Sequence, residues 1–184
     1  DELVDNYEDE GDLRKQFYLV PEYGYTPVCY LAVSKCVFLG ESIPSDDKFM
    51  LALRLSEAYL ILAEAMARLN DLSGSVEVLN QLREKRIKGS EAVLPEPATQ
   101  REMMQEIINE RRKELLFGFS RFWDLKRFNT EADYAKTITR TFPLVSTDVE
   151  KKTYTLKPDS RLYIIPFPLA AREKNPNLTM NTNE

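Results

Sequence analysis

The stretch that most constrains the fold covers residues 54–127, where apolar side chains recur at helical spacing in successive segments. An apolar residue at every third or fourth position gives a helix one face that packs on a core. The first segment predicts a helix over residues 48–69, capped by Asp46 or Asp47 and ended by Asn70. Its apolar face is made by Leu51, Leu55, Ala58, Tyr59, Leu62, Ala65, Met66 and Leu69.

A second helix is predicted over residues 72–86, with Asp71 as its cap and Leu72, Val76, Leu79 and Leu82 as its apolar face. So short a connection to the first helix predicts an antiparallel hairpin. Gly74 and Ser75 lie where the two helices would cross, and small side chains there let the backbones approach closely. This hairpin is similar to a single tetratricopeptide unit, without a fixed-period array.

The third helix starts with Thr99 and Glu102, which match a capping box, and is expected to run to about residue 117. Its buried face would hold Met103, Met104, Ile107, Ile108, Leu115 and Leu116. Arg111 falls on the same face, and a buried arginine needs an anionic partner. We therefore predict a structural ion-pair network made by Glu57, Glu64, Glu110, Arg111 and Glu114.

Outside these helices the pattern is weaker. Residues 1–12 are acidic and predict a loop or mobile lead-in, residues 13–20 a strand or irregular chain, and residues 28–39 a strand. After Asn129, strand-like composition covers residues 138–145, 153–156 and 161–165, followed by a helical turn over 168–173. The expected fold is mainly α with minor β, in one domain over residues 1–184. A helical core over about 48–128 precedes an irregular part over 129–184.

Composition removes several functional classes. The chain has no histidine, so His-dependent catalytic triads and His-ligated zinc are excluded. Its net charge of −5 and the lack of a basic run disfavour nucleic-acid binding. Cys29 and Cys36 are read as buried thiols or a disulfide, and spacing does not decide between them. No apolar run is long enough to span a membrane, and we expect no metal and no cofactor.

Two sets of side chains are candidates for chemistry. Glu110 and Glu114 lie one helical turn apart, which suits the carboxylate pair of a glycosidase, but the surrounding Arg111, Arg112 and Lys113 favour ion pairing. Among the aromatic residues, Tyr23, Tyr25 and Tyr30 are the candidate ligand-binding residues, because aromatic faces stack on sugars and loops often carry binding groups. Trp123 is expected in the core.

Three ordered blocks resemble the C-terminal region of the SusD/RagB family. Arg54, Glu57, Tyr59, Leu60, Ala63, Glu64 and Ala65 fill its pattern R-x-x-E-x-Y-L-x-x-A-E-A. The second block holds Glu110, Arg111, Glu114 and Leu115, then Arg121, Asp124, Leu125 and Arg127; residues 162–166 and 175–181 match the third. The chain departs from the family pattern at Gly118-Phe119-Ser120 and at Met180.

The resemblance implies a non-catalytic, surface-exposed outer-membrane lipoprotein of Bacteroidetes. Such a protein binds glycans, or in some cases peptides, and delivers them to a SusC-like TonB-dependent transporter. The matched region covers roughly residue 54 to the end and lacks the family's N-terminal region and lipidated cysteine. We therefore expect the C-terminal portion of a longer protein, or an unusually short relative. The alternative hypothesis is a protein–protein or peptide-binding module built on the tetratricopeptide-like helix pair.

Overall fold

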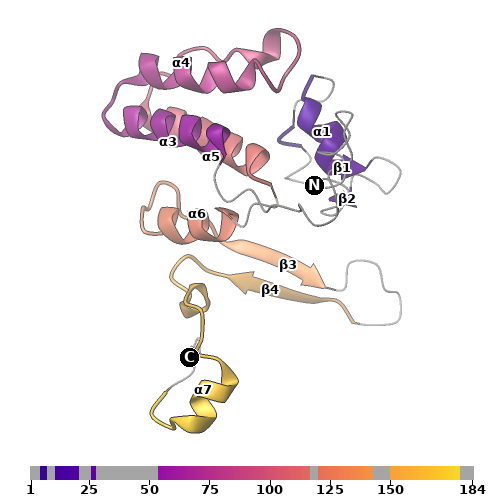
Figure 1. The fold of residues 1–184 in the computed structure, drawn as a ribbon, viewed down its shortest axis with the longest axis vertical. Coiled ribbons are helices and arrows are strands. Elements are labelled where there is room, and N and C mark those ends of the chain that lie inside the picture. Colours follow the sequence, from indigo (N-terminus) through magenta and orange to yellow (C-terminus); the bar gives the residue numbers. More distant parts are fainter. Residues whose placement is uncertain are drawn as a thin grey trace. The chain divides into compact units, whose positions relative to one another are not determined.

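The computed structural model describes residues 5–7, 11–20, 26–27, 54–116, 120–142 and 150–178, and these residues are mainly helical with two small antiparallel sheets (Figure 1). The mainly α fold class with minor β is therefore confirmed. Contacts within the chain divide it into two compact units, Asp1–Arg121 and Phe122–Glu184. The organisation as one domain stays a prediction. The strand expected at residues 28–39 and both cysteines lie outside the described residues.

The first unit contains the predicted helical hairpin. Helix α3 covers Leu55–Arg68 and helix α4 covers Leu72–Arg83. Asn70, with a φ of 62°, adopts the left-handed conformation that turns the chain between them. Asp71 caps α4 by accepting a hydrogen bond from the Gly74 amide at 3.0 Å. The end of α3, the turn at Asn70 and the start of α4 thus lie within a few residues of each other.

Small side chains bring α3 and α4 close together, as the sequence predicts. A Cβ atom added at Gly74 would lie 2.5 Å from Asp71 Oδ2 and would overlap Met66 Cε. Ser75 is fully buried, and its hydroxyl donates a hydrogen bond to the Ala63 carbonyl oxygen at 2.7 Å. A Cβ atom at Gly74 would therefore require Met66 or Asp71 to shift.

The buried face of α3 differs from the predicted one. Buried residues are Ser56, Leu60, Ala63, Glu64 and Ala67. The exposed side includes Leu55, Leu62 and Leu69, with 76%, 50% and 82% of their surface accessible. Both sides of α3 are apolar. The side with small residues is the buried one, because it packs closely against the neighbouring helices.

The start of α3 also differs, because Arg54 has extended backbone and the helix begins at Leu55. A continuous helix from residue 48 through Arg54 is therefore wrong, while residues 48–53 themselves lie outside the described residues. Helix α4 likewise ends earlier than predicted, at Arg83.

Helix α5, Gln100–Glu114, packs against α3 and also contacts α4. Its start carries the predicted capping box, in which Thr99 accepts from the Glu102 amide and Glu102 accepts from the Thr99 amide. The short helix η3, Ser90–Ala92, lies in the connection from α4. The Gln100 side-chain amide donates to the Ala67 carbonyl oxygen at 2.9 Å, which fixes the start of α5 against the end of α3.

Of the N-terminal segment, the described residues 5–7 and 11–12 form a loop, one of the two expected alternatives, and pack into this unit. Tyr7 and Asp12 are each 2% exposed, and Asp12 forms an isolated β-bridge with Ile87. The Lys88 amide donates to the Gly11 carbonyl oxygen at 2.9 Å. Residues 13–20 form helix α1, Leu13–Tyr18, and strand β1, Leu19–Val20, which pairs with strand β2, Thr26–Pro27. The prediction of a strand or irregular chain missed α1.

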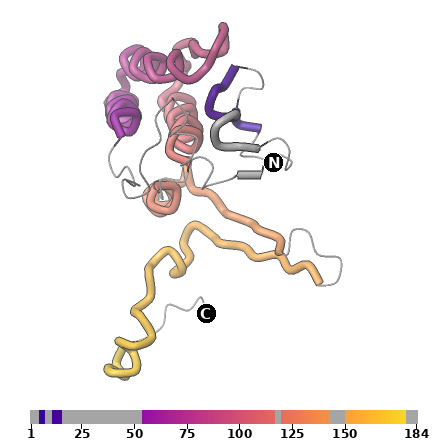
Figure 2. The backbone as a smooth tube through the Cα atoms, turned by 45° about the vertical axis from the view of Figure 1, so that its right-hand side comes forward, coloured from indigo at the N-terminus to yellow at the C-terminus, as the bar shows by residue number. Residues whose placement is uncertain are grey.

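The second unit begins within helix α6, Ser120–Phe128, and continues into a β-ribbon (Figure 2). Strand β3, Ile138–Phe142, pairs antiparallel with strand β4, Lys152–Leu156, in the register Ile138 opposite Leu156 and Phe142 opposite Lys152. The helices η4, Arg161–Tyr163, and α7, Leu169–Lys174, follow. The strand predicted at residues 161–165 is therefore wrong at its start. Ser160 caps η4 by accepting from the Leu162 amide at 3.2 Å.

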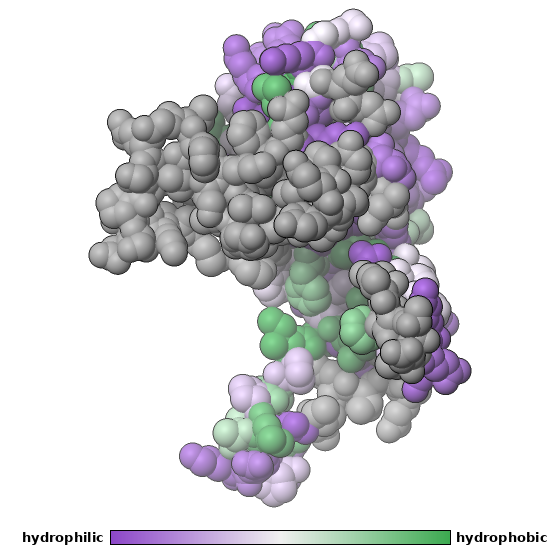
Figure 3. Space-filling model, turned by 90° about the vertical axis from the view of Figure 1, so that its right-hand side faces the viewer, coloured by the Kyte–Doolittle hydropathy of each residue, from purple (hydrophilic) through white to green (hydrophobic). Residues whose placement is uncertain are grey.

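Among its described residues, the second unit buries few large side chains and exposes many. Phe128 and Tyr163 are buried, and the Tyr163 ring lies 5.7 Å from the ring of Phe122. Trp123 is 53% exposed, so its expected place in the core is wrong; its ring meets Phe122 edge-on. Apolar side chains gather at the surface (Figure 3), and those of this unit include Phe142, Leu162, Ile164, Ile165, Phe167 and Leu169.

Candidate functional site

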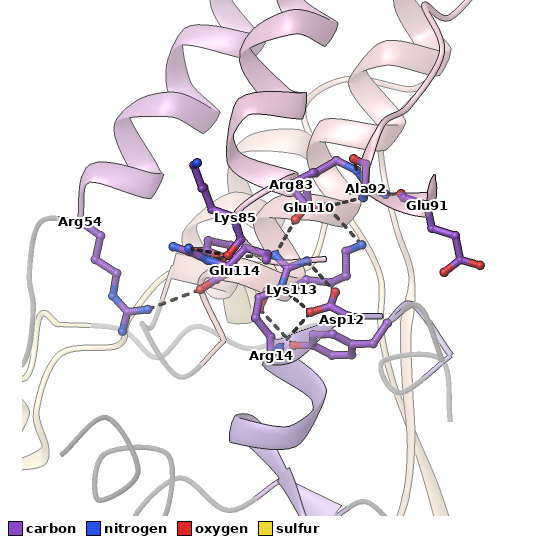
Figure 4. Close-up of polar contacts among 12 residues, drawn as sticks. Asp12, Arg14, Arg54, Arg83, Lys85, Glu91, Ala92, Glu110, Lys113 and Glu114 are labelled. Atoms are coloured by element: carbon purple, nitrogen blue, oxygen red, sulfur yellow. Dashed lines mark hydrogen bonds and ion pairs between the residues drawn. The ribbon is translucent and has the colours of Figure 1, made fainter. Parts of the chain in front are cut away.

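The most densely connected polar group of the described residues surrounds two carboxylates of α5, Glu110 and Glu114 (Figure 4). They lie one helical turn apart, and only 1% and 4% of their surfaces are exposed. Carboxylates this deeply buried need opposite charges and hydrogen-bond donors close by. The chain supplies these from α1, from α4 with the turn after it, and from α5 itself.

Arg14, on α1, connects the N-terminal segment to α5. Its Nη1 atom lies 2.5 Å from Glu110 Oε1 and 3.1 Å from Glu114 Oε2. Its Nε and Nη2 atoms donate to the two carboxylate oxygens of Asp12, at 2.8 and 2.6 Å. A planar guanidinium is suited to this role because its donors spread in a fixed fork. One side chain thereby contacts three carboxylates.

Arg83 and Arg86 bring the end of α4 to the same carboxylates. Arg83 Nη1 lies 2.8 Å from Glu110 Oε2, and its other nitrogens donate to the carbonyl oxygens of Glu91 and Ala92. Arg86 Nη2 lies 2.9 Å from Glu114 Oε1. These contacts fasten the loop after α4 as well as the helix.

Lys113 completes the group from α5 itself. Its Nζ atom lies 3.1 Å from Glu110 Oε2, and its carbonyl oxygen accepts a hydrogen bond from the Tyr7 hydroxyl at 3.1 Å. We use the name buried charge cluster for the residues Asp12, Arg14, Arg83, Arg86, Glu110, Lys113 and Glu114. The cluster contains three acidic and four basic side chains, so its charges nearly balance.

The electrostatics of the cluster keep Glu110 ionised. Burial raises the pKa of Glu110, but the positive charges of Arg14, Lys113 and Arg83 outweigh burial and lower that pKa below its ordinary value. For Arg14, burial acts to lower the pKa, and the hydrogen bond to Asp12 with the charge of Glu110 raises it overall. Both side chains are held in their charged forms.

This protonation state bears on the glycosidase alternative. A general acid at neutral pH needs a carboxyl group whose pKa is raised, so that it still holds a proton. Glu110 has a lowered pKa, and both of its oxygens contact cations. The geometry around Glu110 therefore suits ion pairing and opposes proton donation.

Of the five residues predicted as one structural ion-pair network, Glu110 and Glu114 are joined through Arg14. Glu110 and Glu114 belong to the buried charge cluster. Arg111 Nη2 lies 3.5 Å from Glu57 Oε1, which links α5 to α3. Glu64 pairs with Arg68, one turn along α3, at 2.9 Å.

Sequence reasoning placed Lys113 beside the two glutamates, as found, and missed the cluster's other members: Asp12, Arg14, Arg83 and Arg86. A weak signal was available for two of them. Arg83 and Arg86 lie three residues apart at the end of the second helix, where both can project to one side. Arg14 has no such signal, because its partner Glu110 is 96 residues away in the chain.

The predicted ligand-binding residues Tyr23, Tyr25 and Tyr30 lie outside the described residues. Among the described residues, a groove of about 420 Å³ lies between α3 and the end of α4, lined by Leu55, Tyr59, Gln81, Leu82 and Lys85 among others. Of the exposed leucines of α3, Leu55 lines this groove. Its lining combines apolar with polar and charged side chains and contains a single carboxylate, that of Glu84.

In the described ranges of the chain, no group of three or more histidine, cysteine, aspartate or glutamate side chains is placed to hold a metal ion. Within the same ranges, no helix has both the length and the apolar character needed to cross a membrane.

Comparison with known proteins places the chain in a family. The model of the SusD family matches residues 40–183. A curated SusD-like protein from Formosa agariphila is 32% identical over 104 residues, which cover 54% of this chain and 21% of that protein. The chain thus spans about a fifth of its relative's length. No solved structure matches the chain significantly. Because the family model spans most of the sequence, the chain belongs to the SusD family.

Proposed function

We propose that this chain is part of a non-catalytic protein that captures glycans at the bacterial outer-membrane surface and delivers them to a SusC-like TonB-dependent transporter. The observation that carries the proposal is the family match over residues 40–183. The described structure supports it in one respect. The charged groups that resemble catalytic residues in the sequence, Glu110 and Glu114, are buried in ion pairs. In the whole protein, a lipid anchor would hold the chain at the cell surface.

Ligand contact is proposed for Tyr23, Tyr25 and Tyr30, whose rings would stack on the C–H faces of sugars. The test is affinity gel electrophoresis of the full chain in gels that contain soluble polysaccharides, with tyrosine and tryptophan fluorescence as a second readout. Retardation by at least one polysaccharide is expected. Absence of both retardation and a fluorescence shift across the panel would overturn glycan binding by this chain.

A matched pair of variants tests the three tyrosines. Replacing Tyr23, Tyr25 and Tyr30 by alanine removes the rings and should reduce retardation. Replacing the same residues by phenylalanine keeps the rings and should preserve most of it. Equal retardation of the alanine variant and the wild-type chain would place the glycan elsewhere.

The absence of catalysis is tested with the same polysaccharides. We expect no new reducing ends after prolonged incubation with the wild-type chain. Turnover that disappears in Glu110→Gln or Glu114→Gln would contradict the proposal and assign these carboxylates a catalytic role.

A second candidate function, a protein-binding module, is favoured by the exposed apolar side of α3. Leu55, Ile61, Leu62 and Leu69 are each at least half exposed on one helix. Exposed apolar surface of this kind commonly marks an interface. A pull-down from outer-membrane extract tests for such an interface, and glycan retardation without any captured protein would argue against it. Capture lost in Leu62→Glu but kept in Ser73→Glu would assign the interface to α3.

A further inference from the structure

The β3–β4 ribbon has two chemically different faces. Side chains alternate between the faces of a strand, and the register fixes which residues share each face. One face carries only threonines in its middle: Thr139, Thr141, Thr153 and Thr155. The other carries Arg140 opposite Tyr154 and Phe142 opposite Lys152, with the half-buried pair Ile138 and Leu156 at one end. We call this second face the aromatic–basic face.

The aromatic–basic face is open to solvent. Phe142 is 66% exposed and Tyr154 is 58% exposed, and both basic side chains are exposed as well. The pairing places the two aromatic residues on one diagonal of the ribbon and the two basic residues on the other. Diagonal neighbours on one face of a sheet lie roughly 7–8 Å apart. The result is a small checkerboard of rings and positive charges.

The charge of this face is opposite to that of the chain. The net charge of the whole sequence is −5, whereas the segments ITRTF and KTYTL of the two strands contain Arg140 and Lys152 and no acidic residue. A ligand with negative charges is therefore attracted locally. Two cations are few for a nucleic acid, whose phosphate backbone needs a larger basic surface.

The threonine face provides an internal comparison. Its hydroxyl groups can bond to water or to each other, as Thr141 and Thr153 do at 3.2 Å. The opposite face exposes the apolar surface of two large rings to water. A two-stranded ribbon is also only marginally stable by itself. A partner on the aromatic–basic face would bury these rings and brace the ribbon.

We infer that the aromatic–basic face binds an anionic oligosaccharide, of the uronate or sulfated class. The C–H faces of its sugars would stack on Phe142 and Tyr154, and its carboxylate or sulfate groups would pair with Arg140 and Lys152. An acidic polysaccharide presents apolar sugar faces and negative charges along one chain, which matches the checkerboard. This inference rests on the proposed glycan binding and specifies the class of glycan.

The test compares matched polymers that differ only in charge: dextran sulfate against dextran, and polygalacturonate against its carboxyl-reduced form. Affinity electrophoresis and calorimetry with the full chain should show at least tenfold tighter binding of the anionic polymer in each pair. Arg140→Gln/Lys152→Gln should remove most of that difference. Phe142→Ala/Tyr154→Ala should weaken binding of both anionic polymers by at least tenfold.

Two controls separate this face from other effects. Lys85→Gln/Lys88→Gln removes the same charge from the first unit, and Thr139→Ser/Thr155→Ser alters the other face of the ribbon; each should change affinity less than twofold. Circular dichroism checks that the variants fold. If Tyr154→Ala perturbs the ribbon, Tyr154→Phe replaces it as the test variant; it keeps the ring and should retain binding.

The outcomes also distinguish this inference from the proposed function. Binding of neutral polysaccharides with no preference for anionic ones would overturn the inference and leave glycan capture standing. Binding of no polysaccharide would overturn both. Equal losses of affinity for the anionic polymers in Arg140→Gln/Lys152→Gln and Lys85→Gln/Lys88→Gln would show diffuse electrostatic attraction. That result would overturn the assignment of binding to the aromatic–basic face. Capture of an acidic protein in place of polysaccharide would overturn the inference and show that this face is a protein interface.

Discussion

Arg14 and Glu110 form an ion pair inside the first unit, with only 4% and 1% of their side chains exposed. The two residues come from α1 and α5 and are 96 positions apart in the sequence. The pair therefore closes a long loop of chain, and its partners Asp12, Arg83 and Glu114 extend it to neighbouring elements. We regard this cluster as the polar centre that holds the N-terminal segment on the helices.

Removing Arg14 should be strongly destabilising. Arg14→Met keeps much of the side-chain volume but leaves Glu110 and Asp12 buried without their main partner. Loss of one partner of a buried ion pair costs about 3–5 kcal/mol, and urea unfolding followed by circular dichroism should report a decrease of this size. Lys85→Gln is the control, since Lys85 is exposed and a surface substitution of this kind changes stability by about 0.5 kcal/mol or less. Equal effects of the two variants would contradict the buried role of Arg14.

The stability of the first unit should depend on pH through Glu110. The folded-state pKa of Glu110 is lowered by Arg14, Lys113 and Arg83 despite its burial. As pH falls below the ordinary value of 4.5, the unfolded chain takes up the proton before the folded chain does. Glu110 therefore contributes stability above that pH and loses it as pH falls through the folded pKa. Urea unfolding between neutral pH and about pH 3 should show this loss.

The matched variant for this pH dependence is Glu110→Gln. It removes the titrating group, so its free energy of unfolding should start lower at neutral pH and fall less steeply on the acid side. Parallel pH profiles for the variant and the wild-type chain would show that other carboxylates dominate the acid response.

Local signals in the sequence were sufficient where they act over a few residues. Asp71 and Gly74, and Thr99 and Glu102, make their capping contacts three positions apart, so the residue types alone predicted both helix starts. Asn70 likewise predicted the turn. In each case the physical cause, an unsatisfied backbone group beside a suitable side chain, is contained in the segment itself.

Contacts between distant segments were not predictable in the same way. Arg14 and Glu110 have no shared period, because pairing across 96 residues depends on how the whole unit packs. The two sides of α3 are both apolar, and hydrophobic periodicity does not choose between Leu60 with its small neighbours and Leu62 with its large ones. The β-ribbon face was also missed, because its pattern depends on the register of two strands separated by a loop.

The close approach of α3 and α4 predicts that Gly74→Ala destabilises the hairpin. The new Cβ atom would meet the Asp71 carboxylate, which caps α4, and the end of Met66. Such overpacking costs about 1–3 kcal/mol, which should exceed the gain of about 1 kcal/mol from better helix propensity. Thermal unfolding should show a lower Tm for Gly74→Ala, while the exposed control Ser73→Ala should change it little. A higher Tm for Gly74→Ala would mean that Asp71 and Met66 move aside freely.

The same substitution should destabilise the protein much more on the buried side of α3 than on its exposed side. Leu60→Ala removes a fully buried side chain and should lower the free energy of unfolding by about 2–5 kcal/mol. Leu62→Ala, two residues along the same helix, removes a side chain that is half exposed and should change it by about 0.5 kcal/mol or less. Both variants carry the same chemical change in the same helix, so helix propensity cancels in the comparison. Urea unfolding of the two variants measures the difference, and a larger loss for Leu62→Ala would restore the apolar face that periodicity alone predicts.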